Sequence, residues 1–153
     1  MRKFSILKKY ENVVNEKFKM PCRSTKDSAG YDIFNNTGSE IVLEPGEISR
    51  PITTHLKAYF PNDEVLKIYP RSSHGFKYSL KLANSVAIID SDYALADNDG
   101  EIFLKFHNQS PDKTLVVKPG EAMAQGIFQK YLTTDDDELT VGGTRTGGIG
   151  STN

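Results

Sequence analysis

The sequence predicts an all-β protein, a sandwich, barrel or jelly roll built from many short strands. Clusters of glycine, proline, asparagine and aspartate recur at short intervals and indicate turns. Between them lie short apolar or alternating runs, which are typical of strands. No long segment has the period of a helix, and only residues 74–79 suggest a short helical turn. Frequent turns between many short strands favour these β architectures.

The expected strands begin with residues 41–43, which are wholly apolar, and with residues 54–60, which alternate as a half-buried strand does. Residues 133–138 end in four consecutive acids, which favours a solvated connector over a metal site. We therefore expect one β domain over residues 1–140, followed by a C-terminal tail over residues 141–153. The remaining expected strands are residues 65–69, 80–89, 102–107, 115–117 and 123–131.

The composition is that of a globular protein with no strong overall charge. Apolar residues make up 37% of the 153 residues, which is enough for a core. The formal net charge of −1 predicts no general attraction to nucleic acid or to an anionic membrane. No apolar run has the length of a membrane span, and the first ten residues lack a signal peptide. The single cysteine, Cys22, excludes a disulfide within the chain, so a cytoplasmic protein is expected.

Several chemistries lack the residues that they need. The three histidines, His55, His74 and His107, lie far apart and show no metal-ligand spacing. Cys22 has no second cysteine near it, so the zinc deaminase signature is missing. There is no Gly-Lys-Ser/Thr for a Walker A loop and no Gly-x-Ser-x-Gly for a serine nucleophile. Redox, zinc and acyl-enzyme mechanisms are therefore not expected.

The tail has the composition of a phosphate-binding segment. Residues 142–153 hold five of the chain's twelve glycines, four hydroxyl residues and one arginine, and no acid. Glycine lets backbone N–H groups turn toward an anion, while Arg145, Thr146, Ser151 and Thr152 add charge and donors. Such a tail would be flexible when empty and ordered over its ligand. The alternative is an ordinary frayed terminus.

A carboxylate follows the apolar run 86–89. Asp90 stands at the end of this run, with Asp92 and Tyr93 just beyond it. A carboxylate at the lip of a rigid strand is well placed to orient and deprotonate a water molecule. Two structural alternatives stay open: Asp-Ser-Asp often caps a turn, and a tyrosine is often a core or rim aromatic.

Three other segments offer polar groups suited to an anionic ligand. Arg71 and the two serines that follow it, Ser72 and Ser73, can bind phosphate oxygens, although an ordinary turn with a surface arginine fits as well. Asp32 follows a glycine turn. Gln125 lies inside an apolar strand and therefore needs partners for its amide, either structural or from a ligand.

Taken in order, these segments resemble the five motifs of the trimeric dUTP pyrophosphatases (dUTPases). The five together are very specific, and the resemblance spans roughly residues 27–152. It implies a β jelly roll, a homotrimer whose active sites draw motifs from all three chains, and Mg²⁺-assisted hydrolysis of dUTP to dUMP and pyrophosphate. The motifs are residues 29–33, 70–75, 84–93, 120–128 and 145–152.

The resemblance also implies roles for single residues. Asp90 and Asp32 would be the catalytic pair: Asp90 activating the water that attacks the α-phosphorus in line, and Asp32 near Mg²⁺-bound waters or at the base of the site. No side chain would bind the metal directly. Tyr93 would lie under the deoxyribose and exclude a 2′-hydroxyl, and Asn84 would bind the uracil edge. The expected phosphate ligands are Arg71, Ser72, Ser73 and Gln125, with the closing tail supplying Arg145, Thr146, Gly147, Gly148, Ile149, Ser151 and Thr152.

The chain departs from the family pattern at three places. Ile149 stands where the family usually has an aromatic that stacks on uracil, so an aliphatic and weaker lid is expected. Ala87 replaces a common glycine. Residues 94–99 form an insertion after Tyr93, which resembles phage-borne members and could change the channel or present a surface to a protein partner.

Two rival functions stay open from sequence. A dCTP deaminase shares the implied fold and a similar arginine-serine motif, although Tyr93 and the glycine tail favour the pyrophosphatase. A non-catalytic nucleotide sensor or partner-binding module is the second rival, and Asp90 argues against it.

Overall fold

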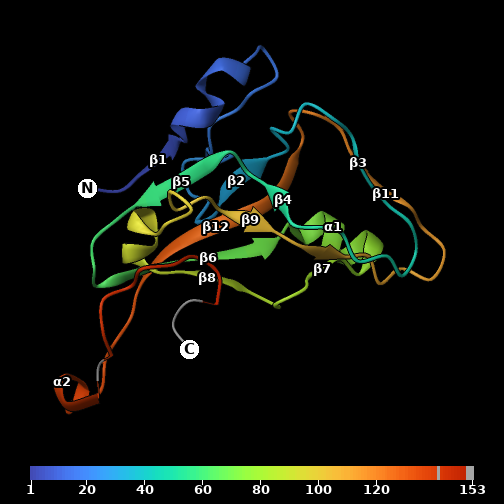
Figure 1. The fold of residues 1–153 in the computed structure, drawn as a ribbon. Coiled ribbons are helices and arrows are strands. Elements are labelled where there is room, and N and C mark those ends of the chain that lie inside the picture. The colour runs from blue at the N-terminus through green and yellow to red at the C-terminus, as the bar shows by residue number, and fades with distance from the viewer. Residues whose placement is uncertain (141, 151–153) are drawn as a thin grey trace.

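The computed structural model describes residues 1–140 and 142–150 and confirms the all-β prediction (Figure 1). Twelve strands occur in the described ranges, with two short α-helices and two 3₁₀ helices between them. The strands are β1 (Lys3–Ile6), β2 (Tyr31–Phe34), β3 (Ile41–Leu43), β4 (Ile52–Thr53), β5 (Leu56–Tyr59), β6 (Glu64–Pro70), β7 (Lys81–Leu82), β8 (Ala87–Ile89), β9 (Phe103–Leu104), β10 (Phe106–His107), β11 (Leu115–Val117) and β12 (Ala122–Lys130). The helices are η1 (Lys8–Val13), α1 (Ser72–Tyr78), η2 (Ser91–Leu95) and α2 (Asp137–Thr140).

The largest sheet has four antiparallel strands in the order β2-β12-β6-β8. The other strands form antiparallel pairs, β1 with β5, β3 with β11, β4 with β9 and β7 with β10. Many short antiparallel pairs wrapped around one larger sheet are the arrangement of a jelly-roll-like barrel. None of the helices in the described ranges has the length and hydropathy that a membrane crossing requires.

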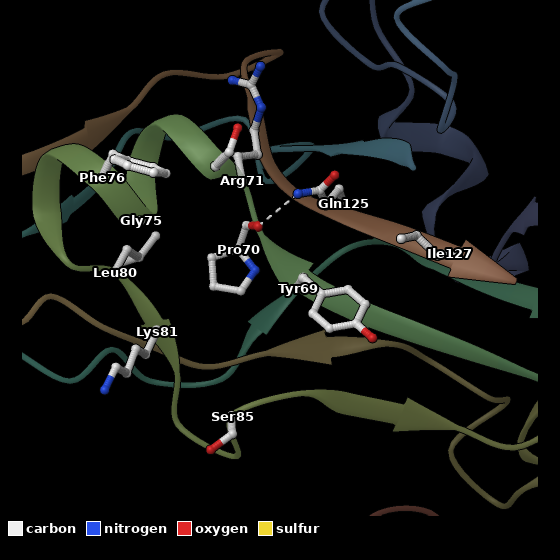
Figure 2. A pocket seen from close by; sticks show the side chains of 11 residues that line it. Tyr69, Pro70, Arg71, Gly75, Phe76, Leu80, Lys81, Ser85, Gln125 and Ile127 are labelled. Carbon is white, nitrogen blue, oxygen red and sulfur yellow. Dashed lines mark hydrogen bonds between the residues drawn. The ribbon is translucent and has the colours of Figure 1, made fainter. Parts of the chain in front are cut away.

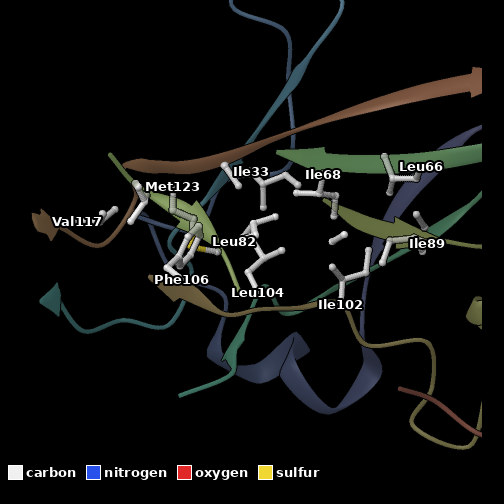
Figure 3. Close-up of a cluster of buried hydrophobic side chains, with 14 of the residues drawn as sticks. Ile33, Leu66, Ile68, Leu82, Ile89, Ile102, Leu104, Phe106, Val117 and Met123 are labelled. Atoms are coloured by element: carbon white, nitrogen blue, oxygen red, sulfur yellow. The ribbon is translucent and has the colours of Figure 1, made fainter. Parts of the chain in front are cut away.

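The core lies between the four-stranded sheet and the segment that carries β9 and β10 (Figure 3). Leu66 and Ile68 of β6 are fully buried, and they face Ile102 and Leu104 across the core. Side chains alternate inward along these strands, because successive Cβ atoms in a strand point to opposite faces. This packing fixes β6 and β8, the two strands that lead into the polar segments considered below.

The structure divides two expected strands and adds elements that the sequence did not predict. Residues 102–107 form β9 and β10. Residues 80–89 form two short strands, β7 and β8, because the chain turns between them at Ser85, whose φ is +66°. The helical turn expected over residues 74–79 begins earlier, as α1. The N-terminal strand β1 and the 3₁₀ helix η1 were not predicted.

A buried carboxylate ties η1 to the barrel. Glu101 is only 2% exposed and accepts hydrogen bonds from the Tyr10 hydroxyl at 2.7 Å, from the Lys9 ammonium and from the Thr53 hydroxyl. Burial acts to raise the pKa of Glu101, but the hydrogen bonds from Lys9, Thr53 and Tyr10 outweigh it and hold the pKa below its usual value. The ionised carboxylate therefore stabilises the folded chain.

Replacing Glu101 with alanine should lower the free energy of unfolding by on the order of 3 kcal/mol, because a buried acceptor is removed and the half-buried hydroxyls of Tyr10 and Thr53 lose their partner. Since the pKa is lower in the folded state, this stabilisation is present above about pH 4.3, the ordinary glutamate value, and is lost as the pH falls through the folded value. Urea denaturation of both proteins between pH 3 and 7 measures the difference.

The matched control is the exposed Glu16, whose change to alanine should alter the unfolding free energy by less than about 0.5 kcal/mol. An equally small effect at Glu101, or a difference that grows toward acid pH, would contradict the structural role given to this carboxylate.

Candidate active site

The first group of predicted site residues meets where β2, β12 and β6 run side by side. Asp32 on β2 stands opposite Gln125 on β12 in the strand register. The Arg71 side chain follows the end of β6, and its Nε lies 3.6 Å from Asp32 Oδ1. Ser24 donates to the other carboxylate oxygen of Asp32 at 2.7 Å. Asp32 therefore orients the arginine.

The amide of Gln125 has a partner within the chain. Its Nε2 donates to the Pro70 carbonyl oxygen at 3.1 Å (Figure 2). Gly30 approaches the same amide so closely that a Cβ there would lie 2.7 Å from Oε1. One partner of this interior glutamine is thus structural, and it joins β12 to the end of β6.

An open cleft of about 920 Å³ lies beside this group (Figure 2). Figure 2 shows Arg71 and Gln125 at one rim, Tyr69 and Pro70 in the middle and Ser85 on the opposite side. The Phe76 ring, also at this cleft, is 95% exposed. A large ring exposed beside an open cleft favours coverage by another molecule. Ser72 also lines the cleft, and Ser73, next along α1, is exposed.

One histidine near Arg71 was not singled out from the sequence. His74 Nδ1 is buried and has no hydrogen-bond partner in the structure. Burial, and then the charge of Arg71, lower the pKa of His74, so the ring is neutral at neutral pH. No spacing signal in the sequence distinguishes this histidine from the other two.

The second group of predicted site residues gathers at the C-terminal end of β8, away from the first group. Asp90 follows β8 and stands at the start of η2, but its side chain makes no capping hydrogen bond. Arg145 of the tail bridges two carboxylates instead: its Nη2 lies 2.5 Å from Asp90 Oδ2 and its Nε 2.8 Å from Asp92 Oδ1. The capping alternative for Asp90 is therefore wrong, and its carboxylate, 53% exposed, faces a cation.

Two hydrogen bonds hold the hydroxyl of Tyr93. Its ring is 7% exposed, and the Arg145 guanidinium lies 5.7 Å from the ring centre. The hydroxyl donates to the Glu101 carbonyl oxygen at 2.8 Å and accepts from Asn98 Nδ2 at 2.8 Å. The core alternative for Tyr93 is therefore correct in part, because the ring belongs to the core while one face meets the tail.

A smaller cavity of about 240 Å³ connects these residues with the tail. Asn84 lies at this cavity, as do Gly148 and the 79% exposed Ile149. The Thr146 carbonyl oxygen accepts from the Asp97 amide at 3.1 Å. Gly147 lies in the same segment. The remaining tail residues of the prediction, Ser151 and Thr152, lie outside the described residues.

The two groups lie at opposite ends of one strand pair. Ile89 pairs with Leu66, which places Asp90 beside Val65, whereas Arg71 follows six residues later along β6. At the rise of an extended strand this separates Asp90 from Arg71 by about 20 Å along the strand. Figure 1 shows α1, which begins after Arg71, at the far end of β6 from the segment that follows β8. Two groups so far apart cannot act on the same phosphorus atom within one chain.

The carboxylates suit a metal ion that arrives with a ligand. Within residues 1–140 and 142–150, no group of three or more His, Cys, Asp or Glu side chains is arranged to hold a metal. Mg²⁺ typically uses one or two carboxylates together with water and substrate phosphates. Asp32, beside the Arg71 cation, offers a carboxylate that can accept hydrogen bonds from metal-bound waters, so the residues present fit an ion held mainly by substrate phosphates.

Sequence comparisons match the chain over most of its length. The family model described as dUTPase matches residues 16–152. A deoxyuridine 5'-triphosphate nucleotidohydrolase of Lactococcus lactis subsp. lactis is 43% identical over 154 residues, which cover 99% of this chain and 97% of that protein. A protein of the same name from Desulfitobacterium hafniense is 37% identical over 141 residues, covering 88% and 87%.

Solved structures share the fold. A crystal structure of dUTPase from Streptococcus mutans has a TM-score of 0.72 and 34% identity, covering 87% of this chain and 98% of that one. The dUTPase from phage phi11 of S. aureus has a TM-score of 0.67 and 22% identity, covering 88% and 93%, and it supports the fold. A mutant of that phage protein was solved to describe the coordination of a structural Mg(II) ion. With a family model over most of its length and a relative at 43% identity, the chain belongs to the dUTPase family.

Proposed function

We propose that the chain hydrolyses dUTP to dUMP and pyrophosphate, with Asp90 as the base that activates the attacking water. The observation that carries the proposal is the position of Asp90. Its carboxylate stands at the end of a strand whose alternate side chains are buried, makes no capping hydrogen bond, and lies against an arginine suited to phosphate. Water attacks the α-phosphorus, its proton passes to Asp90, and the bond to the bridging oxygen breaks to release pyrophosphate.

Arg145 and the tail bind the triphosphate in this proposal. In the free chain the guanidinium pairs with Asp90 and Asp92. A triphosphate carries more negative charge than the two carboxylates and accepts the arginine fork through several oxygens. Its arrival would draw Arg145 away from Asp90 and leave that carboxylate able to take a proton. Thr146, Gly147 and Gly148, with Ser151 and Thr152, complete the closing segment.

Base and sugar recognition fall to the small cavity. Tyr93 presents a ring whose position is fixed by two hydrogen bonds, so it can reject a 2′-hydroxyl by steric exclusion. Asn84 has an amide suited to the polar edge of uracil. A cytosine edge would leave the polar groups that bind uracil without hydrogen-bond partners. The free-energy cost of these unpaired groups discriminates strongly against a cytosine nucleotide. Ile149 closes over the base without a stacking ring.

The other half of the site comes from a second chain in the proposed homotrimer. Asp32, Arg71, Ser72 and Gln125 lie too far from Asp90 to serve the same nucleotide within one chain. The exposed Phe76 beside the cleft supports coverage by a second copy. The family resemblance implies that the tail comes from a third chain, whereas in the single chain described here it lies on its own Asp90.

Mg²⁺ is the proposed cofactor, held on the substrate phosphates with waters near Asp32, where it would neutralise phosphate charge. The proposal includes a cytoplasmic location, which the single exposed Cys22 fits because a reducing compartment keeps a lone thiol unpaired. Ser73, which is exposed on α1, is an additional phosphate ligand in this proposal.

A substrate panel tests the reaction. Pyrophosphate release should be measured with dUTP, dCTP, dTTP and UTP, with and without Mg²⁺. The expected result is release from dUTP above the other three, stimulated by Mg²⁺. Ammonia from dCTP would identify a deaminase of the same fold instead, and binding of dUTP without pyrophosphate would identify a sensor.

Mixing two inactive variants tests whether chains share a site. Asp90→Asn removes the base and Arg71→Ala disables the other half, so each homotrimer should be inactive. After unfolding and refolding together, some sites receive both intact halves, and about a tenth to a quarter of the wild-type activity should return. Pyrophosphate release from dUTP measures it.

The control is to mix the two variants without unfolding, under conditions in which chains do not exchange. Recovery should then be absent. If co-refolded mixtures also stay inactive, each site is complete within one chain and the proposed sharing is wrong.

A further inference from the structure

The insertion, residues 94–99, contacts the tail and the hydroxyl of Tyr93 at the same time. The Asp97 amide donates to the Thr146 carbonyl oxygen at 3.1 Å. Gly148 lies so close to Asn98 that a Cβ at position 148 would stand 2.8 Å from the Asn98 amide nitrogen. The segment that departs from the family pattern is therefore the surface on which the tail rests.

Asn98 has its amide orientation fixed within the loop. The Gly100 backbone N–H donates to Asn98 Oδ1 at 3.1 Å, so Nδ2 is the atom that faces Tyr93. Nδ2 donates to the Tyr93 hydroxyl at 2.8 Å, while that hydroxyl gives its own proton to the Glu101 carbonyl oxygen. The direction of each hydrogen bond is thus determined by the backbone at either end.

We propose that Asn98 is a positioning residue of the active site, which fixes the Tyr93 hydroxyl and supports the closing tail at Gly148. The single chain shows this contact with its own tail, and in the proposed homotrimer the tail of a neighbouring chain would take the same place. This inference rests on the sugar-reading role given to Tyr93 in the proposed function. It adds a residue from the insertion to the determinants of specificity, and the close approach of the Asn98 amide leaves no room for a Cβ at position 148 unless that amide moves.

A purely local role for Asn98 would involve only half of its contacts. An asparagine whose Oδ1 accepts from the residue two positions later forms a common turn, and that alone would stabilise the loop. The Nδ2 contact to Tyr93 and the close approach of Gly148 are not needed for such a turn. The tests below are therefore aimed at these two contacts.

Asn98→Asp tests the contact to Tyr93 with almost no change in size. Oδ1 can still accept from Gly100, but the second oxygen cannot donate to the tyrosine hydroxyl, whose proton is already engaged. We expect kcat/KM for dUTP to fall by about five- to a hundredfold, and the preference for dUTP over UTP to narrow. The same change in a Tyr93→Phe background should alter the dUTP/UTP ratio by less than about twofold, because the hydroxyl is absent.

The tail contact has a readout that does not depend on activity. Trypsin cuts after Arg145, whose side chain is only 11% exposed. Asn98→Ala should accelerate release of the peptide that begins at Thr146 by about fivefold or more, as the tail opens more often. Leu95→Ala, in the same loop and 81% exposed, is the matched control and should leave both the cleavage rate and the UTP discrimination unchanged.

The outcomes separate this inference from the proposed function. If the wild-type protein releases no pyrophosphate from dUTP, the proposed function fails, and the cleavage assay still tests the tail contact. The positioning role is wrong if the wild-type protein is active and the Asn98→Asp variant still prefers dUTP over UTP as strongly as the wild type does. It is also wrong if the effects of Asn98→Asp and Tyr93→Phe on the dUTP/UTP ratio add in the double variant. An unchanged cleavage rate in Asn98→Ala overturns the support given to the tail. Equal melting temperatures of the variants show that each is folded.

Discussion

Replacing Asp90 with asparagine should lower turnover of dUTP by about 10²–10⁴-fold, the usual contribution of a positioned general base. The side chain keeps its size, so dUTP should still bind. The structural reason is that β8 holds Asp90 at its end while no capping bond occupies the carboxylate. Steady-state pyrophosphate release gives the turnover, and calorimetric titration of the variant with dUTP gives the binding constant.

Asp92→Asn is the matched control for this prediction. Asp92 pairs with the same Arg145 and is equally exposed, at 52% against 53% for Asp90. If the role of Asp90 is to accept a proton, the Asp92 variant should retain turnover within about tenfold of wild type. Equal losses in the two variants would show that the carboxylates serve only to hold Arg145. An unimpaired Asp90 variant would remove this residue from the mechanism.

Ending the chain at Val141 should leave the barrel folded and lower turnover by on the order of 10²–10³-fold. Turnover should fall because the shortened chain lacks Arg145, a charged donor to the triphosphate, and the backbone of the tail that closes over the substrate. The barrel should be little affected, since the core lies between the four-stranded sheet and the β9–β10 segment (Figure 3). Thermal unfolding and pyrophosphate release, measured on the same preparation, test both parts.

Arg145→Ala in the full-length chain divides this effect between the guanidinium and the rest of the tail. If the charge dominates, the single change should reproduce most of the loss caused by truncation. Full activity in the shortened chain would refute the closing role of the tail. A large fall in melting temperature would show instead that the tail belongs to the folded core.

The all-β class followed directly from the sequence because its signals are local. Turn residues and alternating runs specify strands within a few positions, as in β5, where buried and half-buried side chains alternate. The jelly-roll arrangement came from the family resemblance, since the pairing of distant strands is not written in any one segment. The break between β7 and β8 was missed, because an apolar run does not reveal a turn at which a serine adopts a positive φ.

Candidate site residues could be found in the sequence where a polar residue directly follows a predicted strand. They were harder to find where the contacts join segments that are distant in the sequence. Asp90 stood out because an apolar run precedes it. Asn98 did not, because its partners include Gly148, fifty residues later. The Glu101 network likewise depends on Lys9, at the other end of the sequence, and the sequence alone gives no sign that this glutamate is buried.

In the proposed homotrimer, the placement of Asp90 and Arg71 at opposite ends of one strand pair would make a solitary copy of this chain half of a catalyst. Catalytic competence would then depend on how many copies are present, since association must come before chemistry. At low expression, the rate of dUTP hydrolysis would fall more steeply than the protein concentration. A defective copy would also lower the activity of the assemblies that it joins. A site shared across the proposed homotrimer would thus set a protein concentration below which dUTP is no longer removed.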